Sequence, residues 1–228
     1  LHAKGDSPGN LLIGELSYQQ WLQYELTAVS EADFARIAAE AMAGEVVGSS
    51  AGGEQPKFCA FVDDKHRLVK FTEPAVNANS LRWADLLQAE HSALNTLANN
   101  GIAAAHSKIV MQEQRTFLSC ERFDRVGTLG RKGLVSLRMA EMEFVDKPAE
   151  WPVIAKHLLQ DKLIIAEHAD TIAVIWCFGR LIANTDMHGG NLSFYYAGEG
   201  ELTLAPVYDM LPMAFAPLRS GAMAFSHT

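Results

Sequence analysis

Apolar residues recur at helical spacing in four segments of the chain, and these segments predict its main helices. The pattern covers residues 31–43, 80–99, 149–163 and 166–182. Gly44 and Asn100-Gly101 end the first two segments, as expected for residues that follow a helix C-terminus. The last segment is apolar on most of its faces, which predicts a helix inside the core of a lobe.

Shorter apolar runs predict two pairs of strands. The first pair covers residues 57–62 and 67–71, joined by a turn at Asp63-Asp64, and the second covers 107–111 and 116–120. Strands therefore alternate with helices in the first half of the chain, whereas helices dominate the second half. This order predicts an α+β fold with a lobe boundary in the glycine-rich and charged stretch 126–133.

Length and composition limit the class of protein. The chain has 228 residues, 49% hydrophobic and 20% charged, which suits one large core or two modest ones. It has no apolar run long enough to span a membrane, and its first thirty residues lack a basic segment followed by an apolar one. We therefore expect a soluble, cytoplasmic protein.

Charge and cysteine usage narrow the class further. A formal net charge of -8 disfavours a large nonspecific nucleic-acid surface. A local basic patch is the less favoured alternative, and it would consist of Arg122, Arg125, Arg131, Lys132 and Arg138. Cys59, Cys120 and Cys177 are widely spaced within apolar segments, so we expect buried thiols in a reducing compartment rather than disulfides or a zinc site.

The polar residues with the clearest chemistry lie near the end of the chain. Asp186 precedes Asn191 by five positions, and Asp209 lies in a later apolar segment. Protein kinases use this arrangement to orient a hydroxyl nucleophile and to hold magnesium. The spacing therefore indicates phosphoryl transfer, although a lone Asp/Asn pair would more often belong to a structural turn.

A glycine-rich loop and a strand lysine fit the same chemistry. The stretch 48–57 contains small residues whose backbone N–H groups can approach phosphate oxygens closely, but taken alone it resembles an ordinary connection. Lys70 ends a predicted strand, and a carboxylate of the following helix, Glu90 or Asp85, would hold it against phosphates. Taken alone, an edge-strand lysine in solvent would be the ordinary interpretation.

Two other classes of function stay open. Asp186, His188 and Asp209 would gather a metal ion in a hydrolase or nuclease, but that interpretation leaves the glycine-rich loop and Lys70 unexplained. A noncatalytic binding module with a degenerate kinase fold is the other alternative. For His188 a structural role in its loop is favoured over contact with phosphate or metal.

Five motifs, in order along the chain, resemble those of HipA-type serine/threonine kinases, the toxins of bacterial toxin–antitoxin modules. The matching segments are Ser50–Lys57, Val69–Phe71, Glu121–Arg125, Asn184–Asn191 and Tyr208–Asp209. The chain is most similar to the branch of this family that carries its own N-terminal DNA-binding segment. The resemblance implies a two-lobed protein-kinase-like fold, with an N-terminal lobe over residues 1–125 and a partial, mainly helical C-terminal lobe over 126–228.

The resemblance also implies cofactors and site residues. It implies ATP- and magnesium-dependent phosphorylation, with Asp186 as the catalytic base and Asn191 and Asp209 as magnesium ligands. The nucleotide-binding residues that it implies are Ser50, Gly52, Gly53, Gln55, Lys57, Lys70, Glu121, Arg122, Phe123 and His188. Ser50 also takes the place of the serine whose autophosphorylation inhibits family members.

The resemblance implies partners as well. They are a protein substrate, with aminoacyl-tRNA synthetases as the associated class, and an antitoxin or a DNA-binding segment. No membrane contact is expected. The family usually continues with further helices after the metal-binding aspartate, whereas this sequence ends at Thr228, so we expect part of the apolar helix near Trp176 to be exposed.

Overall fold

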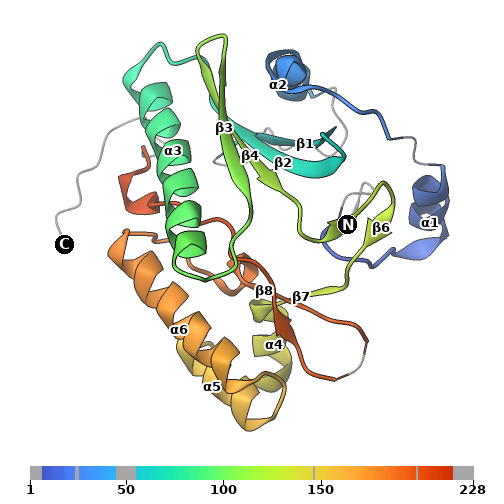
Figure 1. Ribbon diagram of the computed structural model, residues 1–228, viewed down its shortest axis with the longest axis vertical. Helices are drawn as coiled ribbons and strands as arrows, with labels where there is room; N and C mark the ends of the chain where they lie inside the picture. Colours follow the sequence, from blue (N-terminus) through green and yellow to red (C-terminus); the bar gives the residue numbers. More distant parts are fainter. Residues whose placement is uncertain (1–6, 24–25, 45–54, 146, 199, 218–228) are drawn as a thin grey trace.

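A computed structural model describes residues 7–23, 26–44, 55–145, 147–198 and 200–217 (Figure 1). Its α-helices are α1 Gly14–Leu22, α2 Phe34–Met42, α3 Ala78–Asn99, α4 Leu137–Phe144, α5 Trp151–Gln160 and α6 Ala166–Leu181. Short 3-10 turns are η1 Glu31–Asp33, η2 Gly189–Asn191 and η3 Met213–Phe215. The strands form a larger sheet beside α3, a small three-stranded sheet near α4 and a separate two-stranded hairpin, and this mixture confirms the expected α+β class.

The larger sheet is antiparallel and has the strand order β1-β2-β4-β3. Its strands are β1 Lys57–Val62, β2 Lys65–Phe71, β3 Ser107–Gln112 and β4 Arg115–Glu121. Asp63 and Asp64 join β1 to β2 with positive φ angles of 51° and 57°, as in the tight turns that suit the twist of a hairpin. Both predicted strand pairs are therefore confirmed.

Alternation along β2 assigns its side chains to two different environments. Val69 and Phe71 are fully buried and belong to the core that α2 forms with this sheet, where Phe34 contacts Phe58 and Phe117. Lys70 lies between them in sequence and therefore points to the opposite face, toward α3. A charged side chain thus reaches the interior without disturbing the aromatic core.

A second core lies below the sheet and contains α4, α5 and α6 (Figure 1). It includes Ala93, Leu94 and Leu97, which lie near the C-terminal end of α3, and the same helix packs against β3 and β4 of the larger sheet. A three-stranded sheet borders the second core, with β7 Leu134–Ser136, β8 Ser193–Tyr195 and β9 Thr203–Leu204. The hairpin of β5 Arg125–Val126 and β6 Gly130–Arg131 lies within the stretch predicted to separate the lobes.

The predicted helices are present, with some changes of boundary. Residues 31–43 form η1 followed by α2, and α3 begins at Ala78, where Asn77 caps it by accepting from the backbone N–H of Ser80. Helix α5 is shorter than predicted because Asp161 follows its last turn and Lys162 adopts a positive φ of 58°. Helices α1 and α4 were not predicted.

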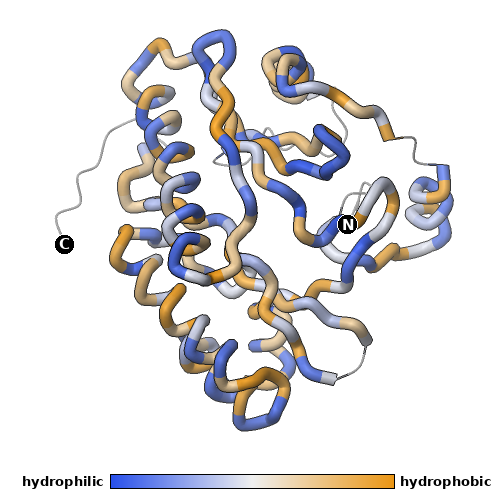
Figure 2. The backbone as a smooth tube through the Cα atoms, in the orientation of Figure 1, coloured by the Kyte–Doolittle hydropathy of each residue, from blue (hydrophilic) through white to orange (hydrophobic). Residues whose placement is uncertain are grey.

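Two expectations about burial were wrong. Cys59 and Cys120 are half-buried, but Cys177 is exposed on α6. That helix buries Ile172 and Ile175, whereas its Val174 and Leu181 are 53% and 85% exposed, so it is not a core helix on most faces. Apolar residues recur along α6 (Figure 2), and the exposure of Val174 and Leu181 agrees with the expected exposure of part of this helix. No helix among the described residues has the length and hydropathy to cross a membrane.

Candidate functional site

A buried cluster of three charged side chains connects the larger sheet, α3 and the segment after β9. The Nζ atom of Lys70 lies 2.7 and 2.8 Å from the two carboxylate oxygens of Glu90 and 2.5 Å from Oδ1 of Asp209. The side chains of Lys70 and Glu90 are 9% and 1% exposed, whereas that of Asp209 is 34% exposed. Asp209 is therefore the member of the cluster that solvent or a ligand can reach.

The charged groups of the cluster shift one another's pKa values. Burial alone would lower the pKa of Lys70, but the adjacent Glu90 and Asp209 outweigh burial and raise it. Burial alone would raise the pKa of Asp209, but the Lys70 ammonium outweighs burial and lowers it. Burial raises the pKa of Glu90 in spite of the adjacent Lys70. When all three groups are charged, the cluster carries one excess negative charge, which favours binding of a cation beside Asp209.

The backbone around Asp209 is held from two sides. Asp209 has a left-handed φ of 59°, a conformation that aspartate tolerates better than most residues. The Asn184 side chain donates to its carbonyl oxygen at 3.3 Å, and Val207 exchanges hydrogen bonds of 2.8 Å with the backbone of Ala103 and Ala105. These contacts fix the carboxylate opposite Lys70.

The segment from Asn184 to Asn191 forms a loop closed by its own hydrogen bonds. The backbone N–H of Asp186 donates to Oδ1 of Asn184 at 3.0 Å, and Nδ2 of Asn191 donates to the carbonyl oxygen of Asp186 at 2.9 Å. Asn184, not Asp186, is therefore the side chain that makes the Asx turn. The Asp186 side chain is 54% exposed, so a large substrate can reach it.

His188, for which the sequence favoured a structural role, is bonded within its own loop. Its Nδ1 accepts from the backbone N–H of Gly190 at 3.0 Å. Its Nε2 lies 3.9 Å from Oδ1 of Asp186, beyond ordinary hydrogen-bond length.

Tyr208 stabilises the loop from Asn184 to Asn191 through its side chain, a role that the sequence did not indicate. Its hydroxyl donates to the carbonyl oxygen of Gly190 at 2.8 Å and lies 2.8 Å from the Ser193 hydroxyl. Burial raises the pKa of Tyr208 to about 12, which keeps this hydroxyl protonated as a donor. Its ring centroid is 5.5 Å from that of Phe123, so the loop and the segment after β4 share one aromatic contact.

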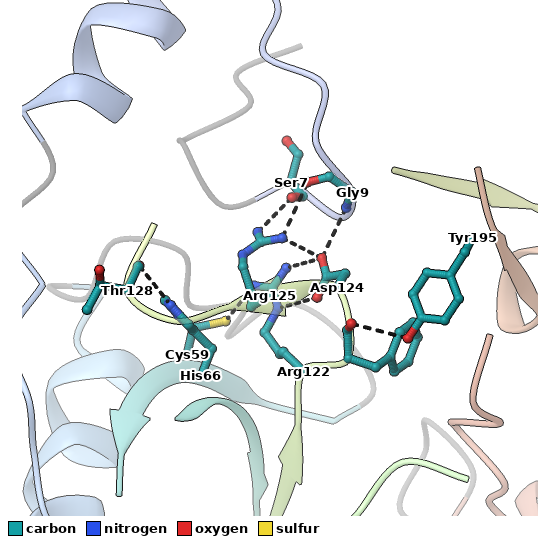
Figure 3. A network of polar contacts seen from close by, with 10 residues as sticks. Ser7, Gly9, Cys59, His66, Arg122, Asp124, Arg125, Thr128 and Tyr195 are labelled. Atoms are coloured by element: carbon teal, nitrogen blue, oxygen red, sulfur yellow. Dashed lines mark hydrogen bonds and ion pairs between the residues drawn. The ribbon is translucent and has the colours of Figure 1, made fainter. Parts of the chain in front are cut away.

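The segment after β4 was expected to border the nucleotide base. Glu121 pairs with Lys65 at 2.9 Å on the surface, and Phe123 packs against Tyr208. The Arg122 guanidinium is instead bound to Asp124, with distances of 3.0 and 2.9 Å (Figure 3). Arg125 also bonds to Asp124, so these two arginines turn inward and do not form the alternative basic surface patch.

The glycine-rich loop is the least described part of the predicted site. Ser50, Gly52 and Gly53 lie outside the described residues. Gln55 donates through Nε2 to the carbonyl oxygen of Phe71, and Lys57 is directly opposite Lys70 in the register of β1 and β2. Gln55 and Phe71 also line a cavity of about 320 Å³ beside the start of α3.

The donor set fits a magnesium ion. Asn191 directs its amide nitrogen to a carbonyl oxygen, so its amide oxygen remains as a ligand atom, and Asp209 contributes a carboxylate. Carboxylate and amide oxygens are hard donors of the type that Mg²⁺ prefers. Within the described ranges no three His, Cys, Asp or Glu side chains gather into a metal-binding group.

Comparisons with known proteins agree with this arrangement. A family model described as "HipA-like C-terminal domain" matches residues 49–228. The chain is 44% identical over 229 aligned positions to a curated protein of Escherichia coli K12 named "Toxin YjjJ", an alignment that covers 96% of the chain. That alignment covers 52% of the relative, so the chain spans about half its length.

Two solved structures share the fold. One is HipA of Shewanella oneidensis MR-1, from a complex with HipB and operator DNA, with a TM-score of 0.53, 21% identity and coverage of 73% of this chain and 44% of that one. The other is the proinflammatory kinase CtkA of Helicobacter pylori, with a TM-score of 0.51, 18% identity and coverage of 68% and 55%. These likenesses confirm the expected kinase-like fold.

Proposed function

The chain belongs to the HipA-like family, and from this premise we propose that its cluster of Lys70, Glu90 and Asp209 is part of the phosphoryl-transfer site of an ATP- and Mg²⁺-dependent serine/threonine protein kinase. One observation carries the proposal. Lys70 is held by Glu90 and by Asp209, from a helix and a segment that are far apart in sequence, as a phosphate-binding lysine beside a metal ligand would be. The alternative of a metal-dependent hydrolase leaves this lysine unexplained.

Each residue of the site has a distinct role in this proposal. Lys70 binds nucleotide phosphates, and Glu90 keeps its ammonium oriented. Asp186 accepts the proton of the substrate hydroxyl at the exposed side of the loop, and Asn191 and Asp209 hold the metal. Bound Mg²⁺–ATP supplies the transferred phosphoryl group and the cation that neutralises its developing charge.

The remaining nucleotide contacts follow the same assignment. We expect the main chain of Glu121 to Phe123 to border the base, because the Arg122 side chain is occupied by Asp124. The other predicted contacts are Ser50, Gly52, Gly53, Gln55, Lys57 and His188. We propose lobes over residues 1–125 and 126–228, so that Lys70 and Glu90 of the first meet Asp209 of the second in the ion cluster.

The cellular role follows from the relatives. We propose a toxin that acts in the cytoplasm on a protein, with aminoacyl-tRNA synthetases as the substrate class to test first. An antitoxin or a DNA-binding segment is the proposed partner, because the HipA protein from Shewanella was solved with HipB and DNA.

Self-inhibition through Ser50 belongs to the same proposal. Phosphorylation would add about -1.5 to -2 charges at the glycine-rich loop, which would repel nucleotide phosphates. We expect a Ser50→Ala variant to keep its activity during long incubation with ATP while the wild type loses it. Equal loss in both proteins would remove this part of the proposal.

Phosphate transfer from labelled ATP tests the proposed activity. The chain is incubated with γ-labelled ATP and Mg²⁺, with casein as an added acceptor, and incorporation into both proteins is measured. Asp186→Asn should lower the rate by roughly 10² to 10⁴-fold because the hydroxyl loses its base. Asp85→Asn is the matched control, since Asp85 is exposed on α3 and outside the ion cluster.

The outcomes separate the classes of function. Incorporation that needs Asp186 but not Asp85 supports the kinase. Transfer that is equal in the Asp186→Asn variant would contradict the assignment of the base. Stabilisation of the folded chain by Mg²⁺ alone, without any effect of ATP, would instead favour a metal-dependent hydrolase.

A further inference from the structure

The N-terminal segment Ser7–Asn10 is bound to the chain just after β4 by main-chain contacts (Figure 3). The backbone N–H of Gly9 donates to Oδ2 of Asp124 at 3.0 Å. Arg125 donates to the carbonyl oxygens of Ser7 at 2.9 Å and Gly9 at 3.3 Å. These contacts join residues more than a hundred positions apart in the sequence.

Charge explains why this segment is bound there. The side chains of Arg122, Asp124 and Arg125 are 10%, 6% and 4% exposed, so two guanidinium groups share one carboxylate away from solvent. Buried N–H donors without acceptors are strongly unfavourable. The carbonyl oxygens of Ser7 and Gly9 supply acceptors that Asp124 alone cannot provide.

The fit of the segment is also close. Gly9 is buried and has a φ of +78°, and a Cβ atom at this position would lie 3.3 Å from the backbone nitrogen of Leu134, the first residue of β7. A Cβ atom on Gly133 would collide with the carbonyl oxygen of Tyr196 and lie 3.4 Å from Oδ1 of Asn10. Glycine at position 9 is thus favoured by its left-handed conformation and by the close approach of Leu134.

Asp124 directly follows the residues proposed to border the nucleotide base. The Arg122 backbone N–H donates to the carbonyl oxygen of His66 at 2.9 Å, and the carbonyl oxygen of Phe123 accepts from Tyr195 at 3.2 Å. Asp124 fixes the far end of this short segment through Arg122 and Gly9. Movement of Asp124 would therefore displace Phe123.

We propose that the docked segment Ser7–Asn10, acting through Asp124 and Arg125, positions Glu121–Phe123 for the nucleotide, so that docking of this segment and nucleotide binding are coupled. The inference rests on the proposed function, because it assumes that ATP binds beside Phe123. Asp124 and Arg125 are positioning residues that need not touch the ligand.

Two glycines allow a matched test. Gly9→Ala places a Cβ atom against Leu134 at a left-handed φ, whereas Gly14→Ala has a comparable φ of +81° and no atom within 4 Å of its Cβ. The dissociation constant for ATP with Mg²⁺ is measured by calorimetry, and amide exchange reports on residues 7–13. We expect Gly9→Ala to speed exchange of the segment and to weaken ATP binding about fivefold relative to Gly14→Ala.

Linkage adds a second readout. If docking and nucleotide binding are coupled, ATP with Mg²⁺ should slow exchange of the Gly9 amide in the wild type. If the segment were only structural, the Gly9→Ala substitution would lower the midpoint of thermal unfolding but would leave the affinity for ATP unchanged.

Several results would overturn the inference. Faster exchange in Gly9→Ala together with unchanged ATP affinity would show that the segment does not position the site. If alanine leaves the segment docked, Gly9→Val imposes a stronger backbone strain and the same comparison applies. Wild-type protein that binds no ATP would contradict both this inference and the proposed function, whereas the first result would contradict this inference alone.

Discussion

Two charge clusters in this protein have net charges of opposite sign when all their groups are ionised. Lys70, Glu90 and Asp209 place two carboxylates around one ammonium, whereas Arg122, Asp124 and Arg125 place two guanidinium groups around one carboxylate. Main-chain carbonyl groups of the N-terminal segment accept hydrogen bonds from the second cluster, whereas the first cluster has the positive charge of Lys57 near its two carboxylates. Asp209 is also the most exposed of these six side chains.

The comparison distinguishes a ligand site from an anchoring site. An unbalanced negative charge at an accessible carboxylate favours a bound cation, while a saturated and inaccessible arginine pair favours fixed structure. The first cluster should therefore respond to nucleotide and metal. The second cluster should affect the stability of the fold when one of its residues is substituted.

The largest expected effect is on stability when Lys70 is removed. Lys70→Met leaves the buried Glu90 without its counter-charge, so the free energy of unfolding should fall by about 3–5 kcal/mol in urea titrations. Lys108→Met is the control, because Lys108 pairs with Glu31 at 2.7 Å with its side chain 57% exposed, and should lose less than about 1 kcal/mol. Equal losses of unfolding free energy in Lys70→Met and Lys108→Met would contradict a stabilising role of the buried Lys70–Glu90 pair.

A double variant sharpens this result. Glu90→Leu in the Lys70→Met background removes the stranded carboxylate and should restore part of the lost stability. A double variant no more stable than Lys70→Met would contradict the proposed cause of the loss.

The second cluster should show its effect in the pH dependence of stability. Burial raises the pKa of Asp124, but Arg122 and Arg125 lower it further than burial raises it, so the net shift is downward. Asp124 therefore stabilises the fold above its unfolded pKa of about 3.9, and this contribution is lost as pH falls through the lowered value. We expect Asp124→Asn to reduce the free energy of unfolding by about 2 kcal/mol at pH 7 and by less at pH 3.

An exposed aspartate provides the comparison for Asp124. Asp33 also has a lowered pKa, from hydrogen bonds to Ser30 and Arg36, but it lies at the surface in η1. Asp33→Asn should therefore change stability less than Asp124→Asn, and salt should reduce its effect. The same deficit for Asp124→Asn at pH 3 and pH 7 would contradict the pairing.

A smaller effect is expected under the Asp186 loop. Tyr208→Phe keeps the ring beside Phe123 but removes the hydroxyl that bonds Gly190, so it should reduce the free energy of unfolding by about 1 kcal/mol. Tyr196→Phe removes an exposed bond to Gly198 and should cost less. A larger loss in Tyr196→Phe would contradict the buried role of Tyr208.

The sequence predicted the main elements because their hydrophobic periods extend over many residues. The sequence did not decide whether Asp85 or Glu90 is the partner of Lys70. These two residues are five positions apart, so they lie on different faces of α3. Glu90 shares the buried face with Leu86, Leu87 and Leu94, and a carboxylate on such a face needs a partner. That pattern would have identified Glu90 before the structure did.

Other features left no periodic signal. Strands β7, β8 and β9 have three, three and two residues, too few for alternation to show. The docking of Ser7–Asn10 uses main-chain atoms, which sequence patterns do not reveal. Tyr208 and Asn184 lie within recognised motifs, but only the fold shows which backbone groups they bind.

The accessible carboxylate of the first cluster provides the most direct test. The midpoint of thermal unfolding is measured with Mg²⁺ alone and then with Mg²⁺ and ATP, for the wild type, Asp209→Asn and Asp63→Asn. Asp63 lies in the exposed turn between β1 and β2 and serves as the control. We predict an ATP-dependent rise in the wild type and Asp63→Asn that Asp209→Asn loses. An equal rise in Asp209→Asn, or none in the folded wild type, would contradict the assignment of this cluster to phosphoryl transfer.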